Sequence, residues 1–399
     1  MLKIAIIGSG PAGLFSCKEL LDHPKLGQSI GCIDIIEALP SPFGMVRYGV
    51  APDHQHIKKV KKKLSQCVED DRVNLYCNVT LGSDLDFKWV KENYDATIIA
   101  VGNHETKQLR LSVQSESDSA SGGRPSPVPV IDANTVVRWY NSHPSQQSCP
   151  IPKKAKRIVV VGNGNVAIDV SRILLSTSKR LSTTDIRPEA ASFLDACDIE
   201  RVTILGRRGP LQAAFSPTEL KELLKIDDIT VATGDETHSA IRAQQDALNA
   251  VPPRSSPARN AEILRKINTV NDDATSDNAP DAAPTKTLVF RFLKSPKTIT
   301  AAPTPGVICT VNTLNELNNV ESRVSPSEKD MFIPADLIIT AIGYAAHPIA
   351  GLDIDPKTGL YHQTNGKVST ASKGQVYTVG WAQVGPKGLI GLHRNLARD

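Results

Sequence analysis

The chain has 399 residues, of which 40% are hydrophobic and 22% charged, and its formal net charge is +4. This length favours about two domains, and the composition is that of a globular protein. The positive charge is too small and too dispersed to favour nucleic-acid binding. No apolar run approaches the roughly 20 residues that a membrane-spanning helix needs, so any membrane association is expected to be peripheral.

A glycine-rich turn opens the chain, between a strand expected at residues 4–7 and a helix expected at 12–21. Gly8, Gly10 and Gly13 have the spacing G-x-G-x-x-G. In this setting the first glycine makes a tight turn, the second lets a pyrophosphate approach the backbone, and the third packs helix on strand. The pattern predicts a dinucleotide site, although a glycine-rich turn of another α/β domain is the alternative.

An acidic residue follows the next expected strand, residues 30–36, as Glu37. A carboxylate roughly 20 residues beyond such a loop accepts hydrogen bonds from a ribose 2′-hydroxyl. It would repel a 2′-phosphate. The first site is therefore predicted to take FAD or NAD.

The same pattern of strand, glycine-rich turn and helix recurs in the middle of the chain. After a strand expected at 157–161 comes a G-x-G-x-x-A turn made by Gly162, Asn163, Gly164, Asn165, Val166 and Ala167. The next expected strand, 201–205, is followed by Gly206, Arg207 and Arg208 instead of an acid. Two guanidinium groups hold a 2′-phosphate by charge and by bidentate hydrogen bonds. The second site is predicted to take NADP, and an ordinary surface arginine pair is the alternative.

Three other segments bear on domain organisation. Residues 112–129, rich in Ser, Gly and Pro, are expected to form a flexible connection. Residues 232–284 are poor in aromatic residues, with one helical patch at 261–267, and are expected to be mostly a mobile insertion. Lysines 58, 59 and 61–63 fill one face of a helix expected near 57–64. We interpret them as solvated, with an acidic partner as the alternative.

The seven cysteines form no C-x-x-C pair and have no metal or iron–sulfur spacing. We expect a reducing compartment and no electron transfer to a dithiol. His54 and His56 lack a third ligand nearby, so no metal site is predicted.

Four motifs together carry a resemblance to a known family. They are P-F-G-M-V-R-Y-G-V-A-P-D-H at 42–54, V-V-G-N-G-N-V-A-I-D-V-S-R-I-L-L at 160–175, G-R-R-G-P-L-Q-A-A-F at 206–215 and G-W-A-Q-V-G-P-K-G-L-I at 380–390. The chain resembles the adrenodoxin reductase type of ferredoxin–NADP reductase over nearly its whole length. The resemblance implies an α/β fold with two Rossmann-like dinucleotide-binding domains, the NADP domain (106–330) being inserted in the FAD domain (1–105 and 331–399).

The resemblance also implies roles for individual residues. Those implied for FAD are Ala12, Glu37, Met45, Leu81, Trp381, Gly388, Leu389 and Ile390. Those implied for NADP are Asn163, Gly164, Asn165, Val166, Arg207, Arg208 and Glu219, the last beside the nicotinamide. His54 and Glu219 are the ionisable groups placed nearest the chemistry. Because hydride transfer needs orientation more than acid or base, we assign them positioning and charge roles.

The function that the resemblance implies is electron transfer from NADPH through FAD to a small acidic 2Fe–2S ferredoxin. The docking residues expected from it are Arg254, Arg259, Arg265 and Lys266. Another NADPH-dependent flavoprotein, of the monooxygenase or disulfide-reductase kind, is the alternative, as is an inactive, shortened member. The family is longer at its C-terminus and carries a basic residue at the position of Val384. The mitochondrion is the implied compartment, otherwise the cytoplasm, and no presequence is visible before Met1.

Overall fold

The structure is a computed structural model, and it describes residues 1–103, 105–114, 128–270, 286–301, 304–368, 374–386 and 390–398. The chain forms two compact units. The first contains residues 1–107, 141–145 and 343–399, and the second contains 108–140 and 146–342. In the described part of the chain, no helix has both the length and the apolar character needed to cross a membrane.

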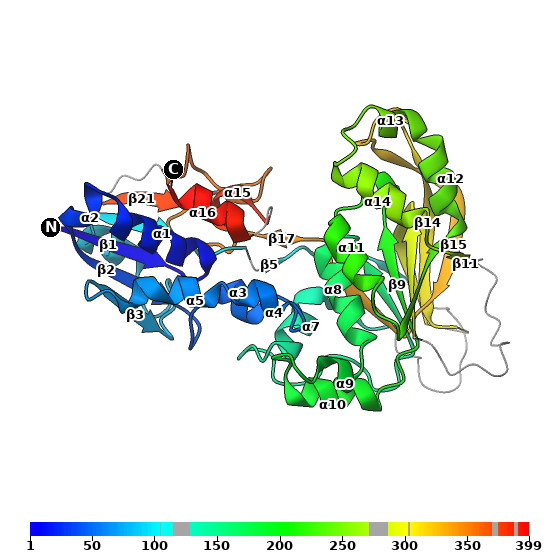
Figure 1. The fold of residues 1–399 in the computed structure, drawn as a ribbon, viewed down its shortest axis with the longest axis horizontal. Helices are drawn as coiled ribbons and strands as arrows, with labels where there is room; N and C mark the ends of the chain where they lie inside the picture. The colour runs from blue at the N-terminus through cyan, green and yellow to red at the C-terminus, as the bar shows by residue number, and fades with distance from the viewer. Residues whose placement is uncertain are drawn as a thin grey trace. The chain divides into compact units, whose positions relative to one another are not determined.

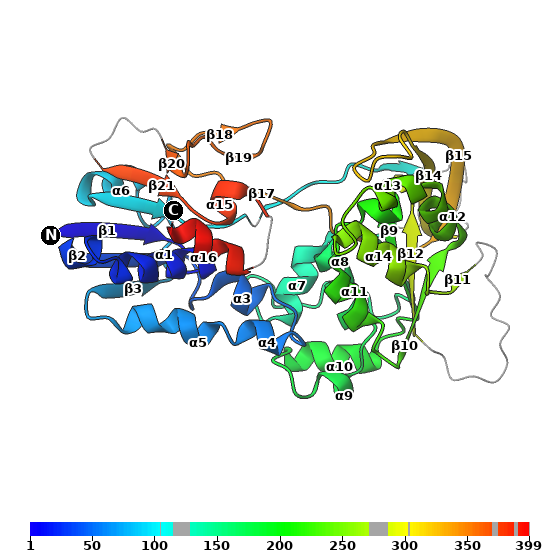
Figure 2. The same cartoon turned by 45° about the horizontal axis from the view of Figure 1, so that its top comes forward.

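The first unit is built on a sheet with the strand order β20-β21-β4-β1-β2-β3. Figure 2 lets this order be followed from β21 through β1 to β3. All neighbours are parallel except β20 and β21. The strands are β1 (Leu2–Ile7), β2 (Ile30–Glu37), β3 (Val73–Cys77), β4 (Ala96–Ile99), β20 (Lys367–Val368) and β21 (Gln375–Thr378). The continuous apolar runs of β1 and β2 are typical of parallel strands covered on both faces.

Helices cover this sheet. They are α1 (Pro11–Asp22), α2 (Leu26–Ser29), α3 (Gly44–Tyr48), α4 (Gln55–Lys58), α5 (Lys61–Leu64), η1 (Ser65–Glu69), α6 (Phe87–Asn93), α15 (Trp381–Val384) and α16 (Ile390–Arg398). Short ribbons pair β5 (Glu105–Thr106) with β17 (Tyr344–Ala345), and β18 (Ile354–Asp355) with β19 (Leu360–Tyr361). Helix α1 buries Leu14 and Phe15 in the core that it shares with β1 and β2. Helix α16 lies beside α1 (Figure 1), where Arg394 is 3.2 Å from Glu19.

The second unit contains a parallel sheet with the order β11-β10-β12-β9-β8-β16-β7. Its strands are β7 (Val130–Asp132), β8 (Arg157–Val161), β9 (Arg201–Gly206), β10 (Ile229–Gly234), β11 (Thr269–Val270), β12 (Lys286–Phe292) and β16 (Leu337–Thr340). Because β16 pairs with β7 and β8, the second boundary between the units lies at Gly343 and not at the expected residue 331.

A further sheet packs on this unit, with the order β15-β14-β13-β6. Its strands are β6 (Ser112–Gln114), β13 (Lys294–Thr300), β14 (Gly306–Leu314) and β15 (Val324–Pro334). Val159 and Leu205 of the parallel sheet share an apolar cluster with Ile299 and Val307. The helices of the unit are α7 (Ala133–Tyr140), α8 (Asn165–Leu174), α9 (Ser178–Leu181), α10 (Pro188–Ala196), η2 (Pro210–Gln212), α11 (Pro217–Leu223), α12 (Asp235–Ala243), α13 (Gln245–Asn249) and α14 (Ser256–Leu264).

The segment expected to be a mobile insertion is largely regular structure. Residues 229–270 form β10, α12, α13, α14 and β11, and β10 pairs with β12 inside the parallel sheet. Ile241 and Leu264 are fully buried in the main core of the second unit. The expectation is therefore corrected for 232–270, because these apolar side chains have a core to enter. Residues 271–285 lie outside the described part, as do 115–127 of the expected flexible connection.

The lysine run is also only partly solvated. Lys58 is 2% exposed, and its Nζ donates a hydrogen bond to Asn141 Oδ1 at 3.1 Å. Lys59, Lys62 and Lys63 are exposed as expected. The helix expected near 57–64 is broken into the end of α4 and α5. The burial of Lys58 corrects the prediction for that residue.

Candidate dinucleotide-binding sites

Each parallel sheet has one point at which the strand order reverses direction. In the first unit it lies between β1 and β4, and in the second between β8 and β16. Ligands of open α/β sheets bind outside the carboxyl ends of the strands at such points. Both predicted glycine-rich loops leave the sheet there, since they follow β1 and β8 directly. The topology therefore provides one candidate dinucleotide site in each unit.

In the first loop the backbone geometry requires glycine. Gly8 has φ of +103°, and a Cβ there would lie 2.6 Å from the Ala100 carbonyl oxygen. A Cβ at Gly13 would collide with the Gly8 carbonyl. At Gly10, by contrast, no atom lies within 4 Å of the Cβ position, and no side chain caps α1. Open space beside the uncapped helix N-terminus, which begins with Pro11 and Ala12, fits a pyrophosphate.

Glu37 is tied to this loop by a set of contacts that sequence reasoning did not predict. It is 7% exposed, and its carboxylate accepts hydrogen bonds from Ser9 N at 2.9 Å, Ser9 Oγ at 2.5 Å and Leu39 N at 2.9 Å. A carboxylate has about four acceptor sites, so capacity for a further donor remains. Glu37 thus fixes the shape of the glycine-rich loop. Its predicted hydrogen bonds to a ribose stay a prediction.

The other residues predicted for FAD lie in different parts of the first unit. Met45 is half-buried in α3, and Leu81 packs at the edge of an apolar cluster that contains Ile7. Trp381 begins α15 directly after β21, and its ring is stacked with that of Tyr344 at a centroid distance of 6.1 Å. Ile390 begins α16, while Gly388 and Leu389 lie outside the described residues.

The second loop repeats the construction of the first. Gly162 has φ of +122°, and a Cβ there would collide with the Ala341 carbonyl, as at Gly8. Gly164 has open space at its Cβ position and precedes α8, which no side chain caps. Ala167, in the place of the third glycine, is fully buried. The site therefore has the same space for a pyrophosphate.

Residues 214–216 brace this second loop. The Asn163 carbonyl accepts from Ala214 N at 3.1 Å and Phe215 N at 3.0 Å. The Asn165 side-chain Oδ1 accepts from Ser216 N at 2.8 Å. The two asparagines are thus held by the chain that leads into α11. In the sequence, these residues belong to the motif A-A-F that follows G-R-R-G-P-L-Q. The motif was noted, but its contact with the glycine-rich loop was not predicted.

Arg207 and Arg208 follow β9 directly and are exposed. The Cβ position of Gly206 lies 2.7 Å from Asn163 Nδ2, so this turn starts against the glycine-rich loop. Among the residues that the structure describes, neither guanidinium has an ion-pair partner. Two unpaired cations at the edge of a dinucleotide loop fit the 2′-phosphate of NADP.

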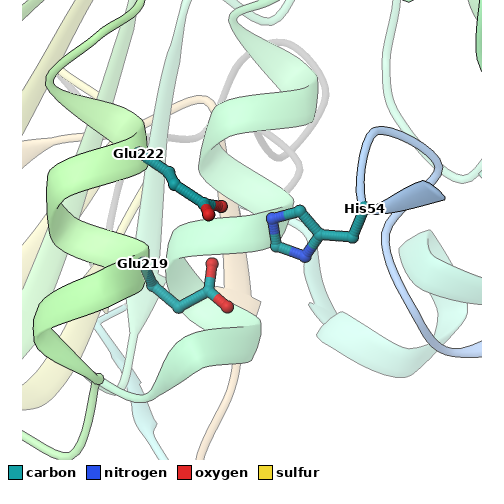
Figure 3. A group of neighbouring side chains, drawn as sticks. All are labelled: His54, Glu219 and Glu222. Atoms are coloured by element: carbon teal, nitrogen blue, oxygen red, sulfur yellow. The ribbon is translucent and has the colours of Figure 1, made fainter. Parts of the chain in front are cut away.

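Glu219 and His54 belong to different units. Glu219 lies in the first turn of α11, with its carboxylate 3.6 Å from the guanidinium of Arg172. Arg172 is 1% exposed and also pairs with Asp169 at 2.9 Å. His54 is 5% exposed and precedes α4. Figure 3 shows His54 on its loop, and Glu219 and Glu222 projecting from the same side of α11.

Comparisons with known proteins place the chain in a family. The model of the pyridine nucleotide-disulphide oxidoreductase family matches residues 2–252. NADPH-ferredoxin reductase FprA of Mycobacterium leprae is 34% identical, over 99% of this chain and 82% of the relative. The mitochondrial NADPH:adrenodoxin oxidoreductase of Drosophila melanogaster is 32% identical, over 97% of this chain and 77% of the relative.

Solved structures agree. The structure of Mycobacterium tuberculosis FprA in complex with NADPH covers the whole of this chain, with a TM-score of 0.84 and 32% identity, and 82% of that chain is matched. The predicted family, the α/β class with two Rossmann-like domains and the oxidoreductase class are confirmed. The chain belongs to the pyridine nucleotide-disulphide oxidoreductase family, and within it to the group of NADPH-ferredoxin and NADPH:adrenodoxin reductases.

Proposed function

We propose that this chain is an FAD-dependent reductase that passes electrons from NADPH through FAD to a small acidic 2Fe–2S ferredoxin. The contrast between the two dinucleotide loops carries the proposal. Glu37 ends the second strand of the first unit, whereas the unpaired Arg207 and Arg208 follow the second strand of the other dinucleotide fold. A carboxylate favours a dinucleotide without a 2′-phosphate, and an arginine pair favours one with it.

The first unit binds FAD. The pyrophosphate lies against the backbone of Gly10, Ala12 and Gly13, where the space at Gly10 admits it. Glu37 receives the adenosine ribose, for which acceptor capacity remains beside its bonds to Ser9 and Leu39. FAD, when bound, accepts a hydride and releases single electrons. The further contacts proposed from family resemblance are Met45, Leu81, Trp381, Gly388, Leu389 and Ile390.

The second unit binds NADPH. The uncapped start of α8 offers the backbone of Asn165 and Val166 to the pyrophosphate, next to Asn163 and Gly164. Arg207 and Arg208 hold the 2′-phosphate. Glu219, beside the nicotinamide, keeps its orientation through Arg172, and we assign Glu219 and His54 positioning and charge roles.

The ferredoxin docks on a basic surface of α14 and its flanks. Arg254, Arg259, Arg265 and Lys266 are all exposed. Lys266 pairs with Glu262 at 2.9 Å, and Arg265 donates to Gln245 Oε1 at 2.7 Å. Arg254 and Arg259 have no ion-pair partner in the described ranges. These two arginines therefore provide most of the attraction for an acidic partner.

One experiment tests the function. The purified protein is assayed for NADPH-driven reduction of cytochrome c with and without an added 2Fe–2S ferredoxin, and its visible spectrum is recorded. We expect flavin absorption, and a rate that requires both NADPH and ferredoxin. A protein that contains no flavin would indicate an inactive member. A flavoprotein that consumes NADPH equally without ferredoxin would indicate the monooxygenase or disulfide-reductase alternative.

We retain the mitochondrion as the proposed compartment. The relative from Drosophila melanogaster is named as mitochondrial, whereas other relatives come from Mycobacterium. The family thus works in both settings, and fractionation of the source cells tests the assignment. Recovery of the protein outside mitochondria would overturn it.

A further inference from the structure

Asn103 follows β4 at the carboxyl edge of the first unit's sheet. On one side of β4, the Ala100 carbonyl lies close to Gly8 of the glycine-rich loop, where its oxygen would be 2.6 Å from a Cβ atom. On the other side, Val379 N donates to the Ile99 carbonyl at 3.1 Å, just before the chain reaches Trp381. Asn103 therefore leaves the sheet at the reversal point between β1 and β4, the place where open α/β sheets bind ligands.

The side chain of Asn103 is buried without being satisfied. It is 3% exposed, and neither Nδ2 nor Oδ1 has a hydrogen-bond partner. Within the described ranges it is the only side chain with both amide atoms in this condition. The preceding Gly102 has φ of +67° and no atom within 4 Å of its Cβ position, so there is space beside it. Buried amides are nearly always hydrogen-bonded, so the missing partner is expected to come from outside the chain.

The chemistry of an amide restricts that partner. Nδ2 donates and Oδ1 accepts, so a matching group must offer an acceptor and a donor together. A pyrophosphate offers acceptors alone and would leave Oδ1 unpaired. The ribityl hydroxyls and the pyrimidine edge of the flavin ring each offer both. We propose that Asn103 binds the flavin half of FAD through its side-chain amide. This inference rests on the proposed function.

The test combines two readouts on the 399-residue chain. Asn103→Leu keeps the size of the side chain and removes both polar atoms. We expect FAD affinity, measured by quenching of flavin fluorescence, to fall about tenfold, which corresponds to the loss of one to two hydrogen bonds. Thermal unfolding of the flavin-free chain should be unchanged or shifted upward, because an unpaired buried amide has been removed. A residue with only a structural role would not give this opposite pair of effects.

Asn103→Asp keeps an acceptor and loses the donor, and it should also weaken FAD binding. The spectrum and midpoint potential of the bound flavin separate the two contacts. A shift in both indicates the ring edge, and weaker binding with neither shifted indicates the ribityl chain. A comparison variant is Asn74→Ala on β3, an exposed residue whose amide donates to Asp34 Oδ1 at 2.8 Å. This control should lower thermal stability and leave FAD affinity unchanged.

Two results would overturn the inference. One is wild-type FAD affinity in Asn103→Leu, which would assign the amide to a bridging water. The other is a loss of flavin-free stability in Asn103→Leu comparable to that of the control. If the wild-type chain itself binds no FAD, the proposed function fails first, and the two failures are thereby distinguished.

Discussion

At the scale of single residues, the arginine pair after β9, Arg207 and Arg208, leads to a prediction about nucleotide specificity. Each charge-assisted hydrogen bond to the 2′-phosphate is worth about 1.5–3 kcal/mol. Replacing Arg207 and Arg208 by Ala should therefore raise the KM for NADPH strongly and that for NADH little. Steady-state kinetics with both nucleotides checks this. Arg254→Ala with Arg259→Ala removes the same charge elsewhere and should leave both KM values unchanged. Equal damage to NADH and NADPH would refute the 2′-phosphate assignment.

Asp34, in the middle of β2, supports a prediction about acid stability. It is 6% exposed and accepts hydrogen bonds from Tyr94 Oη at 2.6 Å and Asn74 Nδ2 at 2.8 Å. Burial alone would raise the pKa of Asp34, but these bonds outweigh it and hold that pKa below its ordinary value. Since the folded-state pKa is the lower one, the stabilisation is complete above the unfolded-state pKa of about 4 and is lost as pH falls below it.

Tyr94→Phe should lower the free energy of unfolding by about 1–3 kcal/mol at neutral pH, because a buried carboxylate loses a donor. The pKa of Asp34 in the folded state should move back toward its ordinary value. In the variant, stability should then decline less steeply between about pH 4 and about pH 2, the range in which a carboxylate with a lowered pKa takes up its proton. Urea unfolding at several pH values measures both effects. Tyr377→Phe, on an exposed ring of β21, is the control; identical acid slopes in all three proteins would refute the assignment.

At the scale of elements, local spacing predicted the glycine-rich loops, their strands and the acidic or basic residue beyond each. Those features depend on a few neighbouring residues. Helices α12 and α13 were not predicted, and α14 was predicted only in part, as the helical patch at 261–267. Averaging over an Ala-, Asp- and Pro-rich composition hides short apolar pairs such as Ala240 with Ile241. Their burial depends on a distant strand, β12. The hydrogen bonds from Ser9 to Glu37 and from Phe215 to Asn163 were missed for the same reason, since each joins residues far apart in sequence.

Core substitutions test this corrected region. Ile241 in α12 and Leu264 in α14 are fully buried. Replacing either by Ala should cost about 2–5 kcal/mol of stability, the range for large-to-small changes in a core. Chemical denaturation gives the value. Leu317, which is 50% exposed, provides a control that should change little when replaced by Ala. If all three variants unfold alike, the segment does not belong to the core.

Helix α14 and the residues that flank it form the proposed docking surface. Charge reversal at Arg254 and Arg259 should slow ferredoxin-dependent turnover several-fold and flatten its dependence on salt. Exposed charges act mainly on encounter rate, and salt screens them over a Debye length of about 8 Å at 0.15 M. Reduction of a small neutral dye should be unaffected. Reversal at Lys62 and Lys63 is the comparison, since both are exposed in a separate basic segment. A loss of ferredoxin turnover confined to that comparison would relocate the docking surface.

At the scale of the whole molecule, both units contain a glycine-rich loop after a parallel strand. An acidic residue, Glu37, ends the next strand in the first unit, and the basic residues Arg207 and Arg208 follow it in the second. The family is named for disulphides, and in this fold Cys17 and Cys67 are neighbours, both buried in the first unit. The interaction between the two thiols raises the pKa of Cys17 and lowers the pKa of Cys67. Both thiols are buried, at 0% and 4% exposure.

The first unit takes strands from both ends of the chain, with β21 pairing to β4 after the whole second unit has intervened. During synthesis on the ribosome, β1 to β4 emerge first but lack their partner strand for more than half of translation. The second unit is complete by residue 342 and is free to fold as it emerges. A nascent chain stalled shortly after Gly343 has cleared the exit tunnel should thus bind NADPH and bind no FAD. Detection of flavin on such a stalled chain would show that β21 is dispensable for the first site.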